Sequence, residues 1–168
     1  MLSLRDFTDK DAQAVACWAE DERTMRFWSA DQFDHYPLCA DDILSFYKKI
    51  LSHGDRVFRF VAEEDGCAVG HFLLREFDKE HHFVRIGFVI LAPCARGKGY
   101  GKKMMKLAVD FAVSHLDARR ITLGVFTNNP AAYGCYRSLG FQKDPAKIDK
   151  MHTFFGEEWI CTELELRV

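Results

Sequence analysis

The feature that most constrains the fold is a glycine-rich loop that follows a predicted strand and opens a predicted helix. Residues 83–91 form an apolar stretch typical of a buried strand, and the loop Arg96-Gly97-Lys98-Gly99-Tyr100-Gly101 follows closely. A helix is predicted over residues 100–115, and alternating apolar residues predict another strand over residues 121–125. Because a strand, a helix and a second strand in this order form a right-handed crossover, we expect the two strands to be parallel neighbours.

The composition of this loop is typical of a phosphate-binding site. Three glycines in six residues allow sharp turns that bring backbone N–H groups against a ligand, and the following helix directs its positive end to the same place. Lys102, Lys103 and Lys106 occupy the first two turns of that helix, where the helix dipole favours acidic residues. The sequence therefore predicts that an anion binds here.

Two common nucleotide-binding motifs are excluded by their spacing. A Walker A loop needs Gly-Lys followed by Ser or Thr, but Gly97-Lys98 precedes Gly99 and Gly101-Lys102 precedes another lysine. A dinucleotide-binding fingerprint needs G-x-G-x-x-G and an acidic residue about 20 positions later. The glycines here are spaced G-x-G-x-G, and residues 119–123 contain no acid. A nucleotide switch is therefore disfavoured.

The loop and a second motif together resemble the GCN5-related N-acetyltransferase (GNAT) family. Residues 96–101 resemble the Q/R-x-x-G-x-G/A motif that holds the pyrophosphate of coenzyme A in that family, and residues 129–141 (NPAAYGCYRSLGF) resemble its N-x-x-A-x-x-x-Y-x-x-x-G-F signature. The resemblance is good over residues 83–141. It implies a mixed α/β fold with a mostly antiparallel central sheet, a splayed parallel strand pair and flanking helices, and we expect one domain over residues 1–168.

The resemblance also implies how acetyl-CoA, the co-substrate, binds. In the family, the pantetheine arm enters the gap between the splayed strands, where the first strand carries a bulge that Gly87 or Pro93 is expected to permit here. A backbone N–H of that strand would then polarise the thioester carbonyl. The expected cofactor-binding residues are Val89, Ile90, Leu91, Arg96, Gly97, Lys98, Gly99, Tyr100, Gly101, Lys102, Asn129 and Tyr136.

Tyr136 is the expected catalytic residue, because the signature places it where the coenzyme sulfur leaves. A phenol with a pKa of about 10 can protonate a poorly solvated thiolate. The alternative interpretation is an ordinary aromatic residue on the packed face of a short helix. Asn129 is expected to contact the pantetheine amides, although a bare helix cap would look the same in sequence.

No general base follows from the resemblance. Many relatives place a glutamate in the strand before the glycine loop, but residues 83–95 contain no acid, and Arg85 stands in that region. Transfer that relies on proximity and an already neutral amine remains open. The other candidates lie at the ends of neighbouring strands and are Glu76, Glu80, His81 and His82.

The cysteines and histidines give no sign of a metal site or a covalent intermediate. The six cysteines contain no C-x-x-C pair, and no Cys or His lies at ligand spacing from the adjacent His81 and His82, so no metal is expected. An acyl-cysteine at Cys94 or Cys135 is conceivable, but no histidine has a motif relation to either. Direct transfer is therefore favoured.

Charge and hydropathy exclude several partners. The formal net charge of −2 gives no basic field for nucleic acid, whereas residues 96–120 carry seven basic and two acidic residues, which suits a small phosphorylated ligand. No apolar run approaches the ~18 residues of a membrane helix. The first residues lack the apolar region of a signal peptide, so a cytoplasmic location is expected.

The remaining pattern is that of alternating helices and strands. An aromatic-rich loop is predicted over residues 27–37, either as a hydrophobic cover over the sheet or as a wall of the acceptor pocket. The other expected elements are strands over residues 2–5, 57–63, 69–77 and 158–168, and helices from Asp9 to about 19, from Asp41 or Asp42 to about 51, and over 130–138.

These observations predict an acetyl-CoA-dependent N-acetyltransferase that transfers the acetyl group directly to a primary amine of a small molecule or a protein N-terminus. The alternative, from a different functional class, is a non-catalytic acyl-CoA-binding or sensor module, which the missing strand acid keeps open. No nucleic-acid or membrane partner is expected, and a homodimer is compatible with the sequence.

Overall fold

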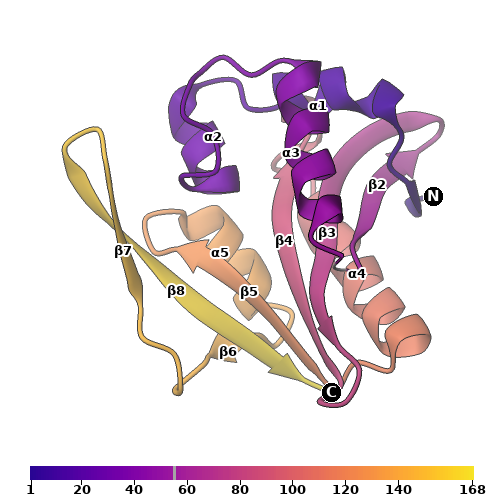
Figure 1. Cartoon of the computed structure of the whole chain (residues 1–168). Helices are drawn as coiled ribbons and strands as arrows, with labels where there is room; N and C mark the ends of the chain where they lie inside the picture. Colours follow the sequence, from indigo (N-terminus) through magenta and orange to yellow (C-terminus); the bar gives the residue numbers. More distant parts are fainter. Residues whose placement is uncertain (55) are drawn as a thin grey trace.

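The computed structural model describes residues 1–54 and 56–168, and its centre is an eight-stranded, mostly antiparallel sheet (Figure 1). The strand order is β1-β2-β3-β4-β5-β8-β6, and β7 pairs with the first residues of β8. The mixed α/β fold expected from the sequence is confirmed. The strands are β1 (Ser3–Asp6), β2 (Phe58–Glu64), β3 (Cys67–Asp78), β4 (Phe83–Leu91), β5 (Arg120–Phe126), β6 (Gln142–Lys143), β7 (Lys150–Phe154) and β8 (Glu157–Arg167).

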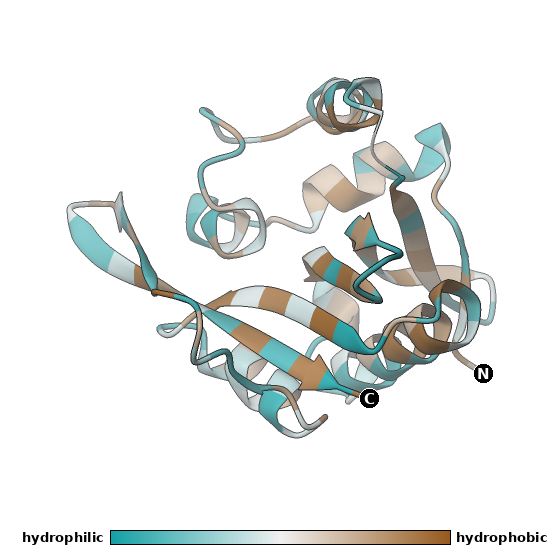
Figure 2. Cartoon of the chain, turned by 60° about the horizontal axis from the view of Figure 1, so that its bottom comes forward, coloured by the Kyte–Doolittle hydropathy of each residue, from teal (hydrophilic) through white to brown (hydrophobic). Residues whose placement is uncertain are grey.

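Helices flank this sheet on both faces. Neighbouring residues of β3 point in opposite directions, so His71 contacts Tyr47 on one face, whereas Phe72 packs against Phe60 on the other. Phe60 in turn contacts Phe111 of the long helix. Hydrophobic and hydrophilic residues alternate along several strands of the sheet (Figure 2). The helices are α1 (Ala12–Cys17), α2 (Glu22–Ser29), α3 (Ala40–Ser52), α4 (Tyr100–Leu116) and α5 (Pro130–Arg137).

The predicted splayed pair is present between β4 and β5. The two strands run parallel and pair at only three positions, the last of which joins Arg85 to Thr122. Beyond this pair, β4 continues to Leu91 and β5 continues to Phe126, but the strands are no longer paired. The sheet therefore opens at the carboxyl ends of β4 and β5.

A bulge in β4 accompanies this opening. His71 of β3 pairs with Ile90, but Leu73 pairs with Gly87, so β4 contains one extra residue between these two pairs. Phe88 has a φ of +53° inside the bulge, beside Gly87. The expectation of a bulge near Gly87 is confirmed. The expectation at Pro93 is wrong, because Pro93 begins a short 3-10 turn after the strand.

The aromatic segment predicted as a loop is partly helical. Phe27 and Trp28 belong to α2, and the carboxylate of Asp21 accepts a hydrogen bond from the Thr24 N–H at 2.6 Å at its start. The helix has only eight residues, and aromatic side chains have modest helix propensity. The sequence pattern consequently does not reveal it.

Other boundaries differ in smaller ways. Thr8, rather than the expected Asp9, is the N-cap of the first helical segment, which begins at Asp9. The cap position of α3 is Cys39, whose N–H donates to the Asp42 carboxylate at 2.8 Å. The sequence does not predict β6 or β7, because elements of two and five residues give little periodicity. β7 forms a hairpin with β8 beside the open end of the sheet (Figure 1).

A buried polar pair joins α3 to β3. The Tyr47 hydroxyl donates to Nε2 of His71, and the Nδ1–H of His71 donates to the carbonyl oxygen of Phe60 at 2.8 Å. His71 is completely buried, and burial lowers its pKa to about 4 because the charged imidazolium would lose its hydration. The neutral tautomer satisfies all of its hydrogen bonds.

This pair predicts an acid-sensitive stability. The unfolded state takes up the His71 proton near pH 6.5 and the folded state only near pH 4, so the free energy of unfolding should fall by about 3 kcal/mol as the pH drops through this window. Urea unfolding between pH 7.5 and pH 4 measures it. His71→Gln, which cannot titrate, should have a flatter profile, and an equal slope in both proteins would contradict this origin.

Candidate active site

The glycine loop exposes unpaired backbone donors at the start of α4. Gly97 and Gly99 have φ values of +72° and +79°, and Gly99 directly precedes the helix. Among the residues that the structure describes, no acceptor meets the N–H groups of residues 97–102. The first N–H groups of a helix have no partner within the helix, so the turn presents them together at its positive end. This geometry suits an anion such as a pyrophosphate.

Lysines surround these donors. Lys98, Lys102 and Lys103 are exposed, and the ammonium group of Lys103 lies 5.4 Å from the centre of the Tyr100 ring. Gly101 packs inside the same turn, where an added Cβ would lie 3.4 Å from Leu91. The lysines therefore add positive charge around the loop, and the glycines keep its backbone accessible.

Arg96 plays a different part from its neighbours. Its guanidinium donates to the carbonyl oxygens of Leu91 at 3.1 Å and Trp18 at 2.5 Å, and to the Glu20 carboxylate at 2.9 Å. These contacts tie the loop to the end of β4 and to the segment after α1. The side chain expected to bind the cofactor is thus engaged in holding the loop in place.

The end of β4 lines the gap in the sheet. Ile90 and Leu91 pair with His71 and Gly70 of β3 on one side. Their other side, like that of Val89, faces β5 beyond the last residue pair of the parallel ladder. The three residues expected to face pantetheine therefore lie at the opening, although the Leu91 carbonyl is already hydrogen-bonded to Arg96.

The second motif lies against the first. α5 contacts both α4 and β5, and an added Cβ at Gly101 would be 3.8 Å from Sγ of Cys135. Asn129 caps α5, since its side-chain oxygen accepts a hydrogen bond from the Ala132 N–H at 3.3 Å. The expected cap is therefore confirmed, and the pantetheine contact of Asn129 stays a prediction.

Tyr136 is a buried phenol beside this junction. The residue is 7% exposed. Burial, followed by the nearby Cys135, raises the pKa of Tyr136 above its ordinary value. The phenol therefore keeps its proton at neutral pH, as a proton donor must.

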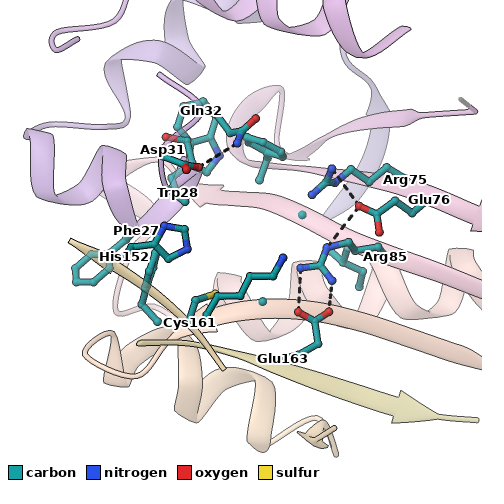
Figure 3. Close-up of a pocket in the computed structure, with 18 of the residues that line it drawn as sticks. Phe27, Trp28, Asp31, Gln32, Arg75, Glu76, Arg85, His152, Cys161 and Glu163 are labelled. Atoms are coloured by element: carbon teal, nitrogen blue, oxygen red, sulfur yellow. Dashed lines mark hydrogen bonds and ion pairs between the residues drawn. The ribbon is translucent and has the colours of Figure 1, made fainter. Parts of the chain in front are cut away.

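A pocket of about 420 Å³ opens where β4 and β5 diverge (Figure 3). Its walls come from α2 and the following loop, from β3, β4 and β5, and from the β7–β8 hairpin. Phe27, Trp28, Phe88 and Phe126 supply aromatic surface. The sequence leaves open whether the aromatic segment over residues 27–37 covers the sheet or walls a pocket. Trp28 does both, because it is buried in the core and also lines this pocket.

An ion pair that the sequence does not predict crosses the floor of the pocket. The guanidinium of Arg85 on β4 forms a two-point contact with the carboxylate of Glu163 on β8, and the second of these contacts is 3.1 Å long. Gly124 of the intervening strand makes room for it, since a Cβ there would lie 3.1 Å from Arg85 Nη2. The partner of Arg85 thus comes from a strand 78 residues further along the chain.

The residues predicted as general-base candidates differ in whether they line the pocket. Glu76 lines the pocket and lies 3.2 Å from Arg75 and 3.9 Å from Arg85. His81 contacts the Asp78 carboxylate, and the Nδ1–H of His82 donates to the Asp117 carbonyl oxygen at 3.0 Å; neither residue lines this pocket. Glu80 does not line it either. His152 of β7 is a pocket residue that sequence reasoning missed, because β7 itself was not predicted.

The cysteines offer no activated nucleophile. Cys94 is exposed, and burial raises the pKa of Cys135, so its thiol stays protonated and weakly nucleophilic. In the described part of the chain, no three His, Cys, Asp or Glu side chains group as a metal site. Within the same residues, no helix combines the length and hydropathy needed to span a membrane.

Known proteins share this sequence pattern and fold. Spermidine N(1)-acetyltransferase of Escherichia coli strain K12 is 29% identical over 154 residues, which cover 92% of this chain and 78% of that protein. The spermidine N(1)-acetyltransferase of Vibrio cholerae serotype O1 is 25% identical over 150 residues, covering 89% and 83%. These relatives thus match most of the chain.

A solved structure agrees with them. The crystal structure of spermidine N-acetyltransferase from Vibrio cholerae in complex with CoA and spermine has a TM-score of 0.80 and covers 99% of this chain and 95% of its own, at 24% identity. This similarity shows a shared fold. The sequence also matches the acetyltransferase (GNAT) family over residues 13–141, which is well over half of its length. The resemblance seen in the two motifs is confirmed, and the chain belongs to the acetyltransferase (GNAT) family as an N-acetyltransferase.

Proposed function

We propose that this acetyl-CoA-dependent N-acetyltransferase holds the coenzyme in the opening between β4 and β5 and acetylates a primary amine of a small molecule in the adjoining pocket. The observation that carries the proposal is the meeting of three features at one end of the sheet. They are the unpaired N–H groups of residues 97–102, the buried phenol of Tyr136, and a pocket beside the bulge in β4.

The glycine loop fits the pyrophosphate of the coenzyme. Its N–H groups are unpaired, an added Cβ at Gly97 or Gly99 would meet no atom within 4 Å, and Lys98 and Lys102 add positive charge. Arg96 would support coenzyme binding indirectly, by holding the glycine loop against the end of β4. Val89, Ile90 and Leu91 would present backbone groups to the pantetheine, and one N–H would polarise the thioester carbonyl.

Tyr136 would complete the reaction as the general acid. The amine nitrogen forms a bond to the acetyl carbon, the carbon–sulfur bond breaks, the amine loses a proton and the departing sulfur gains one from the phenol. A buried phenol is a weak acid, but a thiolate in an apolar gap is also more basic than in water. Direct transfer needs no acyl-cysteine. Glu76 is the one predicted base candidate at the pocket.

A small-molecule acceptor has two supports. Curated relatives at 25% and 29% identity are named spermidine N(1)-acetyltransferases, which act on a small polyamine. The pocket volume of about 420 Å³ also lies in the usual range for small-molecule sites. The sensor alternative is disfavoured because the relatives that match 92% and 89% of this chain are named N-acetyltransferases.

An amine panel tests the proposal. Purified protein is incubated with acetyl-CoA and single amines, which include polyamines, amino acids and short peptides, while free thiol is measured. We expect amine-dependent thiol release with at least one small amine. Coenzyme binding without turnover on any amine, or turnover on peptides alone, would contradict the proposed function.

A further inference from the structure

The charges that line the pocket are unusual for a site that binds a polycation. Four lining side chains are cationic and three are anionic. Glu163 is occupied by Arg85, and Glu76 lies against both arginines. The cationic residues are Arg75, Arg85, Lys147 and Lys150, and the anionic residues are Asp31, Glu76 and Glu163.

The two arginines face each other across neighbouring strands. Arg75 of β3 pairs in register with Arg85 of β4, which is a repulsive arrangement for two like charges. Glu163 neutralises the charge of Arg85 through a two-point contact. Figure 3 shows Glu76 between the two guanidinium groups, where it cannot neutralise both.

Arg75 has unused hydrogen-bonding capacity. Its Nη1 approaches Glu76 at 3.2 Å, whereas its Nε is buried and has no hydrogen-bond partner among the described residues. Burial lowers the pKa of Arg75, since a guanidinium loses hydration there. The side chain is held over Gly87, where a Cβ would lie 3.3 Å from Nε, and its charge lies 5.6 Å from the Phe88 ring. A fixed, poorly hydrogen-bonded guanidinium at a pocket wall is suited to bind a carboxylate.

We infer that the acceptor of this enzyme is an amino carboxylate, a small molecule that carries a carboxylate as well as the reacting amine, and that Arg75 binds the carboxylate. The inference rests on the proposed function and narrows its substrate class. A polyamine brings further positive charge to a wall that already has an excess of cations, whereas an amino carboxylate brings a compensating anion. Arg75 is then a specificity-determining residue of the pocket.

Matched pairs of acceptors test this directly. Each pair differs by one carboxylate: lysine against 1,5-diaminopentane, phenylalanine against phenethylamine, and 4-aminobutanoate against propylamine, with spermidine added alone. We expect kcat/KM to be about 10- to 100-fold higher for the carboxylate member of at least one pair, the scale of a charge-assisted hydrogen bond. Preference for spermidine and the carboxylate-free amines would overturn the inference and leave the proposed function standing. Turnover of none of these acceptors would overturn the inference, and the broader amine panel then decides the proposed function.

Variants of Arg75 test whether this residue causes the preference for acceptors that carry a carboxylate. Arg75→Met keeps the stem that packs near Phe88 and should abolish the preference by raising KM for the carboxylate member, with little change for its partner. Arg75→Lys, which keeps the charge without the fork, should restore part of it. The matched control is Arg56→Met, since Arg56 also lies over a phenylalanine ring, at 4.8 Å, but outside the pocket. An equal loss for both members of a pair would show that Arg75 is only structural and would overturn the inference.

Discussion

Replacing Tyr136 with phenylalanine should lower kcat by about 10²-fold or more, the usual scale for loss of a general acid, while acetyl-CoA binding survives. The change removes one hydroxyl and keeps the ring, which packs 6.3 Å from Phe141 in the buried layer under α5. Because the ring and its packing are kept, the substitution should cost the fold little. Steady-state kinetics with a saturating acceptor and calorimetric titration with coenzyme A measure the two effects separately.

The matched control for this variant is Tyr133→Phe, one turn earlier on α5, where the tyrosine is half-buried rather than buried. It should keep its turnover. If Tyr136→Phe retains kcat under conditions where chemistry is rate-limiting, the phenol is a packing residue and the proton comes from another group. A parallel loss of coenzyme binding and turnover would also contradict the assigned role.

The second large effect is expected from Gly99→Val, which should weaken coenzyme A binding by about 10²-fold, equivalent to losing about one strong charge-assisted hydrogen bond. Gly99 has a φ of +79°, which a β-branched residue adopts only with strain, and it precedes the helix whose first N–H groups are unpaired. A relaxed backbone would turn these N–H groups away from the pyrophosphate. Isothermal calorimetry gives the dissociation constant directly.

A second glycine separates backbone strain from ligand binding. Gly66, in the turn between β2 and β3, has a φ of +78° and open space around its Cα, as Gly99 does. Gly66→Val should therefore lower the stability by a similar amount and leave coenzyme affinity unchanged. Unaltered affinity in a folded Gly99→Val protein would mean that the loop does not hold the coenzyme.

The part of the fold that sequence predicts best is the unit around β4, α4 and β5. Its strand from Phe83 to Leu91 and its helix from Tyr100 carry strong periodicity, and the glycine loop between them has few structural alternatives. The same holds for α5, where Asn129 caps the start and Gly140, with a positive φ, lies in the turn that follows the helix. These elements contain most of the expected coenzyme-binding residues because local motifs suffice to form that part of the site.

The acceptor pocket could not be predicted in the same way. Arg85 and Glu163 meet only because the strand order puts β8 beside β5 and because Gly124 leaves a gap between them. Sheet order and register depend on the whole chain, so no local pattern at Arg85 indicates its partner. The only sign of this pairing in the sequence is that the strand carrying Arg85 contains no acidic residue. α2 and β7, which wall the pocket, are likewise too short for periodicity to identify them.

The most direct test of the central claim is a single-turnover experiment on enzyme loaded with acetyl-CoA and mixed with an accepted amine. Free thiol, N-acetylated amine and the intact mass of the protein are followed in the same samples. Direct transfer at this site predicts that thiol and acetylated amine appear together in equal amounts, only after the amine is added, and that the protein mass never changes. Thiol release without amine, accompanied by a protein heavier by one acetyl group, would contradict it.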